Sequence, residues 1–261
     1  FSVGQFNGSS GYKEAAVQGF MAGVNAAMKV LGRERFIIDR SQGYIGVLID
    51  DLVTKESHEP YRMMTSRSEY RLLLRQDNAD MRLTEMGYEM GLISEERYQK
   101  YCKKKEAIEK EIKRLEAIYV GAGERTQEVL LSHGSTPLQT SATLAELIRR
   151  PELNYEAVRD LDPEREDLPK DVCDQVNINI KYDGYIRRQA QQVRQFKKLE
   201  NKKIPVEIDY QKVNSLRIEA VQKLEAVRPA SIGQDSRISG VSPADITVLM
   251  VYLETLRGGK S

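Results

Sequence analysis

The sequence has no tryptophan and only five phenylalanines among its 261 residues, so its hydrophobic cores must rest mainly on Leu, Ile, Val, Ala and Tyr. Its two cysteines, Cys102 and Cys173, lie far apart and form no CxxC motif. We expect ordinary intracellular thiols at both positions rather than a disulfide. The two histidines, His58 and His133, are isolated, and the sequence therefore predicts no metal site.

Long apolar runs are also missing: no stretch reaches the length that spans a membrane, and no secretory signal is visible. Charge of one sign is not in excess, since 40 Lys and Arg balance 39 Asp and Glu. The net field will therefore not draw nucleic acid to the molecule, although local basic patches could. Together with a charged fraction of 30%, these features predict a helical soluble protein in the cytoplasm.

The first segment, residues 4–31, joins a turn rich in Gly, Asn and Ser to an apolar helix rich in Ala and Gly. Gly8 and Gly11 permit backbone conformations that a Cβ would forbid, and Ser9 and Ser10 are predicted to cap the helix. A helix start presents unpaired N–H groups to an anion or cofactor, which is one interpretation. The other, which the spacing alone favours, is a capped and buried helix.

A second helix is predicted over residues 44–55, because its apolar residues follow helical spacing. These residues, which should form its buried face, are Ile45, Leu48, Ile49 and Leu52. Asp50 and Asp51 fall outside that face, so we expect them to contact water or a partner. Without a base or metal ligand nearby, a catalytic role for this pair is disfavoured.

Four arginines mark the next segment: Arg62, Arg67, Arg71 and Arg75. Ser66 and Glu69 fit a capping box, which predicts a helix that begins near Arg67. On that helix the last three arginines, at i, i+4 and i+8, would share one face.

This face has two interpretations that the residues leave about even. With Tyr61 and Tyr70 close by, it could bind RNA phosphates and stack unpaired bases. Alternatively, it is a solvated face with ion pairs to Glu69, Asp77 and Asp80.

Two long helices are predicted further on, from a Ser94 cap to about Tyr119 and from Asp171 to about Asn201. In the first, Lys103–Lys105 favours a solvated face over a nucleic-acid site, because acidic residues follow. In the second, Gly184 suggests a kink or the close approach of another element. Shorter helices are predicted over residues 84–92, 126–132, 141–150, 155–161, 215–227 and 244–256.

The end of the chain alternates turn and helix signals from Ser231, until Ser242 and Pro243 predict the start of a final apolar helix. An exposed apolar face for a protein partner and a self-contained helical cap are both consistent with this pattern. Few Lys or Arg lie near the Gly turns, so phosphate binding there has little support. The clearest boundary within the chain is the charged, Pro-bounded stretch over residues 162–169.

Several stretches, taken in order, resemble the glucose-inhibited division protein A family, the FAD-binding subunits of tRNA uridine carboxymethylaminomethyl-modifying enzymes. They are GQFNGSSGYKEAAVQGFMAGVNAA, YIGVLIDDLVTK, PYRMMTSRSEYRLLLRQDNADMRLTE, LAELIRRPE, KYDGYIRRQ and RPASIGQDSRISGVSPADI. No single stretch is decisive, but the ordered set is highly specific and runs nearly to the end of the chain.

The resemblance implies a mainly α fold, a multi-helix bundle with a small C-terminal helical module, that corresponds to the C-terminal portion of such an enzyme. It implies three regions: residues 1–35, the end of the FAD-binding domain; residues 36–168, a helical middle region; and residues 169–261, a partner-binding module. We expect the chain to be the back part of a longer protein. Its first helix should pack poorly without the sheet of the flavin domain.

The activity implied by the resemblance is FAD-dependent addition of a carboxymethylaminomethyl group to the wobble uridine of tRNA. It implies NADH as reductant, a GTPase partner subunit and a homodimer. The implied FAD contacts are Gln5, Asn7, Gly8, Ser9, Gly11 and Tyr12. The implied tRNA contacts are Arg62, Arg67, Arg71 and Arg75. The implied contacts with the GTPase are Tyr185, Arg187, Arg188, Gln189, Ile232, Gly233, Arg237 and Gly240.

Two parts of the family's machinery do not occur in the sequence: the GxGxxG fingerprint, and the catalytic cysteine motifs, which neither Cys102 nor Cys173 matches. We therefore predict no catalytic residue, no turnover and no stably bound FAD for this chain alone. A free-standing helical RNA-binding module and a protein-interaction scaffold remain as alternatives.

Overall fold

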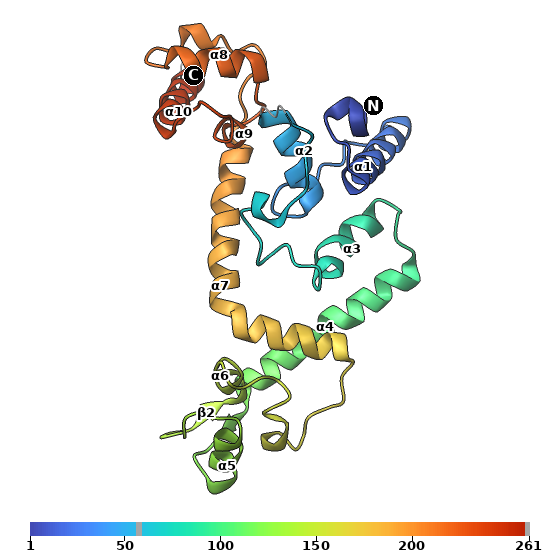
Figure 1. Ribbon diagram of the computed structural model, residues 1–261, viewed down its shortest axis with the longest axis vertical. Coiled ribbons are helices and arrows are strands. Elements are labelled where there is room, and N and C mark those ends of the chain that lie inside the picture. Colours follow the sequence, from blue (N-terminus) through green and yellow to red (C-terminus); the bar gives the residue numbers. More distant parts are fainter. Residues whose placement is uncertain (56–58, 259–261) are drawn as a thin grey trace. The chain divides into compact units, whose positions relative to one another are not determined.

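The computed structural model describes residues 1–55 and 59–258 and is mainly α-helical, as predicted (Figure 1). Strands among these residues are limited to β1 (Tyr119–Val120) and β2 (Ala142–Thr143), which pair antiparallel with Tyr119 opposite Thr143. No helix within the described ranges combines the length and apolar character needed to cross a membrane. His58 lies outside the described residues.

The chain divides into two compact units. Unit 1 combines Phe1–Leu74 with the described residues from Gln189 onward, and unit 2 is the continuous segment Arg75–Arg188. The limits of these units do not coincide with the predicted boundaries after residues 35 and 168. The units reflect contacts within the structure, whereas the three regions follow from a resemblance in sequence, so the division into three regions stays a prediction.

Unit 2 is a helical bundle around one leucine-rich core. Its helices are α3 (Ala79–Glu89), α4 (Glu95–Ala117), α5 (Glu124–Ser132), α6 (Leu144–Ile148), η3 (Arg159–Leu161) and the first part of α7 (Lys170–Asn201). Ser94 caps α4 by accepting a hydrogen bond from the Arg97 N–H, as predicted. Tyr101, Ile108 and Leu115 recur at a spacing of seven on α4 and are all buried, which anchors this helix along its length.

The N-terminal part of unit 1 contains η1 (Gly4–Asn7), α1 (Tyr12–Val30), α2 (Tyr44–Thr54) and η2 (Thr65–Arg67). The predicted serine cap of α1 is wrong, because the N-cap residue is Gly11 and no side chain caps this helix. The Ser9 hydroxyl instead accepts a hydrogen bond from Gln18 of α1. Phe20 and Val30 of α1 are exposed, in line with the expectation of an incompletely packed first helix.

The C-terminal part of unit 1 gathers η4 (Tyr210–Lys212), α8 (Ile218–Val227), α9 (Ile232–Asp235) and α10 (Pro243–Gly258) after α7, in the orange to red part of Figure 1. Tyr210, Leu224, Ile232 and Leu249 form the centre of its core. Ser242 accepts a hydrogen bond from the Asp245 N–H and Pro243 opens α10, which confirms the predicted start of the last helix.

Some local predictions differ from the structure. The helix predicted over residues 84–92 begins earlier, at Ala79, and the one over residues 155–161 is reduced to turns and η3. Gly184 lies in α7 as expected, but no neighbouring atom comes within 4 Å of the position of its Cβ, so the predicted close approach is absent among the described residues.

Candidate functional site

The turn that precedes α1 is held by one buried side chain, Gln18. Its Oε1 accepts hydrogen bonds from the Gly4 N–H (3.0 Å) and from the Asn7 side-chain amide (3.1 Å), and its Nε2 donates to the Ser9 hydroxyl (2.8 Å). The carbonyl of Gly8 accepts a further bond from the Tyr61 N–H at 2.8 Å. The turn is therefore a rigid element, fixed to α1 and to the arginine segment.

The six predicted FAD contacts separate into accessible and inaccessible groups. Gln5, Gly8 and Tyr12 are exposed and Asn7 is half-buried, whereas Ser9 and Gly11 are buried. Gly8 has a φ of +69° and open space at the position of its Cβ, so a planar group could approach its backbone. The turn thus offers one flat, exposed edge to a ligand and does not enclose it.

Glu14, near the start of α1, is a functional neighbour that the sequence did not indicate. Its carboxylate accepts a hydrogen bond from the Met63 N–H at 2.8 Å, and this bond is the main reason that the pKa of Glu14 is lowered. The side chain of Arg62 lies beside Gly11 and Glu14 and adds to this effect. The start of α1 and the arginine segment are therefore coupled through Glu14.

A large apolar groove of about 1040 Å³ runs along α1 in unit 1. Its lining includes Met21 of α1, Ile37 and Ile38 of the following loop, and Leu52 of α2. Of the predicted FAD contacts only Asn7 lines it. The groove and the exposed edge of Gln5, Gly8 and Tyr12 thus share no lining residue.

The predicted arginine helix is wrong. Only Thr65–Arg67 is helical, as the short η2, and Ser68 is extended, with φ −93° and ψ 135°. The Ser68 hydroxyl accepts a hydrogen bond from the Tyr70 N–H, a local bond that competes with helix formation. Arg67, Arg71 and Arg75 therefore do not line one helix face.

The two tyrosines of this segment do not offer a surface to RNA bases, because Tyr61 and Tyr70 are only 2% and 7% exposed. Tyr61 packs under the guanidinium of Arg67, whose Cζ lies 4.3 Å from the ring centre. Tyr70 packs with Val47 and Leu74 and meets the ring of Phe196 edge-on. The predicted stacking of unpaired bases on these rings is therefore wrong.

The four arginines differ in what they can reach. Arg62 and Arg71 are exposed, and no hydrogen bond or ion pair engages either one within the described ranges. Arg67 is one-third exposed, 3.9 Å from Asp51, and its Nε has no partner among the described residues. Arg75 pairs with Asp77 at 3.1 Å, as the solvated-face interpretation predicts.

The predicted exposure of Asp50 and Asp51 is also wrong, because both belong to a buried ion network around Arg40. Arg40 is 2% exposed and donates to Asp50 at 3.0 Å, to Asp51 at 2.6 Å and to Glu69 at 2.7 Å. Asp51 also accepts from Lys55 at 2.9 Å and from the Tyr61 hydroxyl at 2.9 Å. The buried residues of α2 are Gly46, Val47, Leu48, Asp51 and Thr54. Of the four residues predicted for its buried face, Leu48 is confirmed, whereas Ile45, Ile49 and Leu52 are only half-buried.

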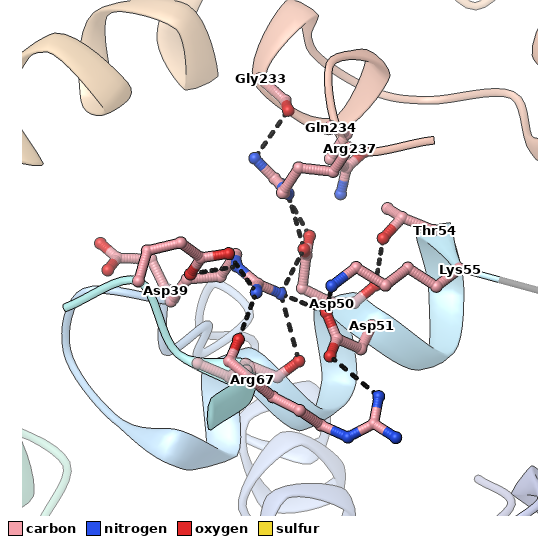
Figure 2. A network of polar contacts seen from close by, with 12 residues as sticks. Asp39, Asp50, Asp51, Thr54, Lys55, Arg67, Gly233, Gln234 and Arg237 are labelled. Carbon is pink, nitrogen blue, oxygen red and sulfur yellow. Dashed lines mark hydrogen bonds and ion pairs between the residues drawn. The ribbon is translucent and has the colours of Figure 1, made fainter. Parts of the chain in front are cut away.

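Asp50 extends this network to a residue far along the chain, Arg237. Figure 2 shows the Asp50 carboxylate facing the Arg237 guanidinium, with Nε and one terminal nitrogen each at 2.7 Å. Arg237 also pairs with Glu200 and donates to the Gly233 carbonyl. This bidentate pair joins α2 to the C-terminal part of unit 1.

The charges of the network stabilise one another. Burial raises the pKa of Asp51, but hydrogen bonds from Lys55 and Arg40 outweigh it, so that the pKa lies below its ordinary value. Burial likewise lowers the pKa of Arg40, and its bonds to Glu69 and Asp51 reverse this. Burial and the Asp51 carboxylate together raise the pKa of Tyr61. None of these groups is poised to exchange a proton near neutral pH, which favours a structural role for the cluster.

The predicted partner residues on α7 are accessible. Tyr185 is 62% exposed, Arg187 and Arg188 are exposed, and Arg187 pairs with Asp183 at 2.7 Å. Gln189 is half-buried and donates weakly to the Glu69 carbonyl at 3.3 Å. A partner could therefore meet Tyr185 and its two arginine neighbours without rearrangement.

The predicted partner residues near the C-terminus lie mostly inside the chain. Ile232 is fully buried in the core, Gly233 is buried against Glu200, and Arg237 is held by Asp50 and Glu200. Gly240 is half-buried with a φ of +96°. Their side chains organise unit 1, and direct contact with a partner stays a prediction.

One carboxyl in this region lacks a hydrogen bond. Asp235 of α9 is fully buried, and neither of its oxygens has a partner among the described residues. Burial, with a smaller contribution from Asp245, raises the pKa of Asp235 to about 7. The Tyr210 hydroxyl is also buried without a described partner, and burial and the charge of Asp235 raise its pKa to about 12.

Sequence reasoning missed Arg40, Gln18 and Glu200, which hold the network and the turn. Because the partners of these three residues lie in other elements, the helical spacing of the sequence around each residue does not indicate its role. A usable signal was the acidic pair itself, since a carboxylate inside an apolar helix requires a buried cation nearby. Among the described residues no group of acidic, His and Cys side chains could hold a metal ion, and both cysteines are free thiols.

Three protein-family models of one enzyme match successive parts of the chain. Residues 95–190 match the tRNA modifying enzyme MnmG/GidA C-terminal helical domain, and residues 192–261 match the C-terminal helical bundle of the same enzyme. Residues 1–34 match the glucose inhibited division protein A family. The chain belongs to the MnmG/GidA family.

Curated relatives agree with the family models. The chain is 61% identical to the tRNA uridine 5-carboxymethylaminomethyl modification enzyme MnmG of Caldicellulosiruptor saccharolyticus, over 99% of this chain and 41% of that protein. It is 65% identical to the MnmG of Lachnoclostridium phytofermentans, over 100% of this chain and 42% of the relative. The chain therefore spans about two fifths of the length of these relatives.

Solved structures of the family share the fold. Aquifex aeolicus GidA in its form II crystal superposes with a TM-score of 0.83 at 41% identity, covering 97% of this chain and 40% of that one. The form I crystal gives 0.80 at 42% identity. The order of helices described above is thus an arrangement that the family adopts.

Proposed function

We propose that this chain forms part of a subunit that, with a GTPase partner, adds a carboxymethylaminomethyl group to the wobble uridine of tRNA. The observation that carries the proposal is the match over nearly the whole chain to relatives that bear the name of this activity. Within that activity we assign binding surfaces to this chain, since the polar cluster around Arg40 is an ion network with a structural role.

The tRNA surface that we propose rests on Arg62 and Arg71. Both side chains are exposed and form no hydrogen bond or ion pair within the described part of the chain, so they are available to neutralise phosphates. The charge of Arg62 also stabilises the Glu14 carboxylate, whose pKa it helps to lower. Arg67 supports this surface from its position over Tyr61, and Arg75 contributes less because Asp77 already pairs with it. Among the four predicted arginines, we therefore expect Arg62 and Arg71 to contribute most to tRNA affinity and Arg75 to contribute least.

The cofactor surface that we propose is the exposed edge formed by Gln5, Gly8 and Tyr12. A dinucleotide site normally buries most of its ligand, and this edge covers only one side of it. FAD, reduced by NADH, would therefore contact this edge while other residues of the enzyme hold most of the cofactor. Ser9 and Gly11 would support the edge from inside.

The GTPase surface that we propose is centred on Tyr185, Arg187 and Arg188 of α7. An exposed aromatic ring flanked by arginines has the composition of an interface centre. A homodimer of the complete enzyme and a cytoplasmic location complete the proposal.

The test of the tRNA surface is fluorescence anisotropy with labelled unmodified tRNA over a range of salt concentrations. The double variant Arg62→Ala/Arg71→Ala should bind more weakly, and its slope of log affinity against log salt should fall by about two. The control Lys113→Ala/Arg125→Ala removes the same charge from exposed positions of unit 2 and should leave the slope unchanged. Equal effects of both double variants, or no tRNA binding by the parent chain, would favour the interaction-scaffold alternative.

A further inference from the structure

Unit 2 contains a pocket of about 570 Å³ that none of the predicted sites includes. It lies between α3, α4 and the start of α7. Its polar lining consists of Asp80, Thr84, Arg97, Lys100, Lys103, Lys104 and Asp171. Tyr101, Ala107, Pro169 and Val172 form the apolar part of the wall.

Cations outnumber carboxylates in this lining by four to two, and all four cations come from α4. Their spacing explains the arrangement, because Arg97, Lys100 and Lys104 at i, i+3 and i+7 lie along one side of the helix. A near-neutral chain thus concentrates positive charge at one point of unit 2, which its net charge of +1 conceals.

The two carboxylates are already satisfied. Lys104 lies 2.8 Å from Asp80 and 2.8 Å from Asp171, and these two partners raise its pKa although burial opposes them. Asp171 also accepts hydrogen bonds from the backbone at the start of α7, which together with Lys104 lowers its pKa. The helix start is therefore occupied by its own acidic residue and is not the ligand-binding element.

Two cations are left without a partner. Arg97 and Lys103 are exposed, and the side chain of neither takes part in a hydrogen bond or an ion pair within residues 1–55 and 59–258. Lys100 pairs with Glu96, and both side chains are more than 70% exposed, so that pair is weak and easily exchanged. The pocket thus holds three cationic side chains that an incoming anion can engage.

We propose that this pocket binds a phosphate group, and that the phosphate belongs to an RNA backbone. Arg97 offers a planar set of donors that matches two phosphate oxygens, while Lys100 and Lys103 add compact charges. The choice of RNA rests on the proposed function, whereas the phosphate site itself rests on the lining alone. The site adds a contact in unit 2 to the surface at Arg62 and Arg71 in unit 1.

This assignment changes the interpretation of Lys103–Lys105. The sequence favoured a solvated face for all three lysines, but the structure separates them. Lys104 holds the two carboxylates, and Lys105 lies 4.0 Å from Glu85 and above the Tyr101 ring. Lys103 alone is exposed beside the pocket without a described partner.

The experiment uses the double variant Arg97→Ala/Lys103→Ala with two probes, labelled tRNA and inorganic phosphate. The matched control is Lys110→Ala/Lys113→Ala, which removes the same charge from exposed positions of α4 that do not line the pocket. Anisotropy measures the salt slope of tRNA binding. Side-chain NMR of arginine measures shifts of the Arg97 guanidinium on addition of phosphate. Circular dichroism melts verify that both variants fold.

We expect the pocket variant to lower the salt slope of tRNA binding by about two while the control leaves it unchanged. Saturable shifts at Arg97 with phosphate, without any effect of the variant on tRNA binding, would establish the phosphate site but assign it to a small phosphate ligand, which overturns the RNA part. No shift at Arg97 together with equal effects of the two variants would overturn the site as a whole. Because the phosphate titration needs no tRNA, a failure of the proposed function is distinguishable from a failure of this pocket.

Discussion

At the scale of single residues, Arg40 is a buried cation that pairs with three carboxylates. It is the shared partner of Asp50, Asp51 and Glu69, and it comes from a loop that the sequence did not mark as important. Removing one member of a buried ion network leaves the others uncompensated, which costs more than the network contributes when complete. The consequence is a strong dependence of unit 1 on one guanidinium.

We therefore expect Arg40→Met to lower the free energy of unfolding by about 3–5 kcal/mol, because Asp51 keeps its burial and loses its main cation. The measurement is the urea midpoint at unchanged slope. Arg71→Met, which changes an exposed arginine in the same unit, should shift the midpoint little. Similar shifts in the two variants would mean that Lys55 and Arg67 can replace Arg40.

Asp235 leads to a prediction on pH. Its pKa is about 7 in the folded chain and near 3.8 when unfolded, so the folded state binds the extra proton between these values. Stability should consequently rise as the pH falls from 8 towards 5, by at most about 1.4 kcal/mol per pH unit. Asp235→Asn, which keeps the shape and removes the titration, should be less dependent on pH in this range.

The measurement is thermal unfolding of both proteins between pH 5 and pH 8. The pKa values of Asp51 and Glu14 are lowered, so these groups change stability only at pH values near and below those at which free carboxyl groups titrate. They therefore do not contribute between pH 5 and pH 8. Parallel curves for the two proteins would show that Asp235 has a partner in solution that restores its ordinary pKa.

At the scale of elements, two glycines within helices have opposite surroundings. A Cβ on Gly46 of α2 would overlap the carbonyl oxygen of Asp39, whereas the same atom on Gly184 of α7 would meet nothing within 4 Å. The first glycine permits a close approach between α2 and the preceding loop. The second only lowers the helix propensity of α7.

Substitution by alanine should therefore act in opposite directions at the two sites. Gly184→Ala should raise the free energy of unfolding by about 0.5–1 kcal/mol through helix propensity. Gly46→Ala should lower it by about 1–3 kcal/mol, because backbone atoms must move. Chemical denaturation of both variants provides the measurement, and stabilisation by Gly46→Ala would contradict the described packing of α2.

The elements that were predicted correctly are those that local chemistry defines. The helices that begin after Ser94 and Ser242 carry their caps and their apolar period within one stretch of sequence. The prediction of a helix in the arginine segment was wrong for two reasons. The Ser68 hydroxyl accepts a hydrogen bond from the Tyr70 N–H, and Tyr70 and Leu74 pack into a core that Phe196 completes. Helix propensity and residue spacing are local properties, so they cannot predict packing against a residue more than a hundred positions away.

The candidate sites show the same limit. The exposure of Arg62, Arg71 and Tyr185 leaves these side chains accessible for the roles that the resemblance implies. The resemblance implied partner contacts for Arg237 and Ile232, but Ile232 lies in the core and Arg237 is held by Asp50 and Glu200. Sequence alone could not tell a surface turn from a turn closed by Asp50 and Glu200.

At the scale of the whole molecule, the cofactor surface that we propose is an exposed edge, which the described residues do not enclose. We expect the purified protein to carry no bound FAD, because Gln5, Gly8 and Tyr12 cover only one side of such a ligand. The measurement is the absorption spectrum after purification and again after incubation with excess FAD and gel filtration. A retained flavin band would show that the groove along α1 or another surface completes the site.

The way unit 1 is assembled also has a consequence for synthesis. Asp50 and Arg237 are separated by 187 positions, and the whole of unit 2 is translated between them. At about 5–20 residues per second, Asp50 waits roughly ten to forty seconds for its guanidinium partner on the ribosome. During that interval Asp50 lacks one of its two cationic partners and the surface of α2 that Arg237 later contacts is incompletely covered, which exposes nascent unit 1 to misfolding and aggregation.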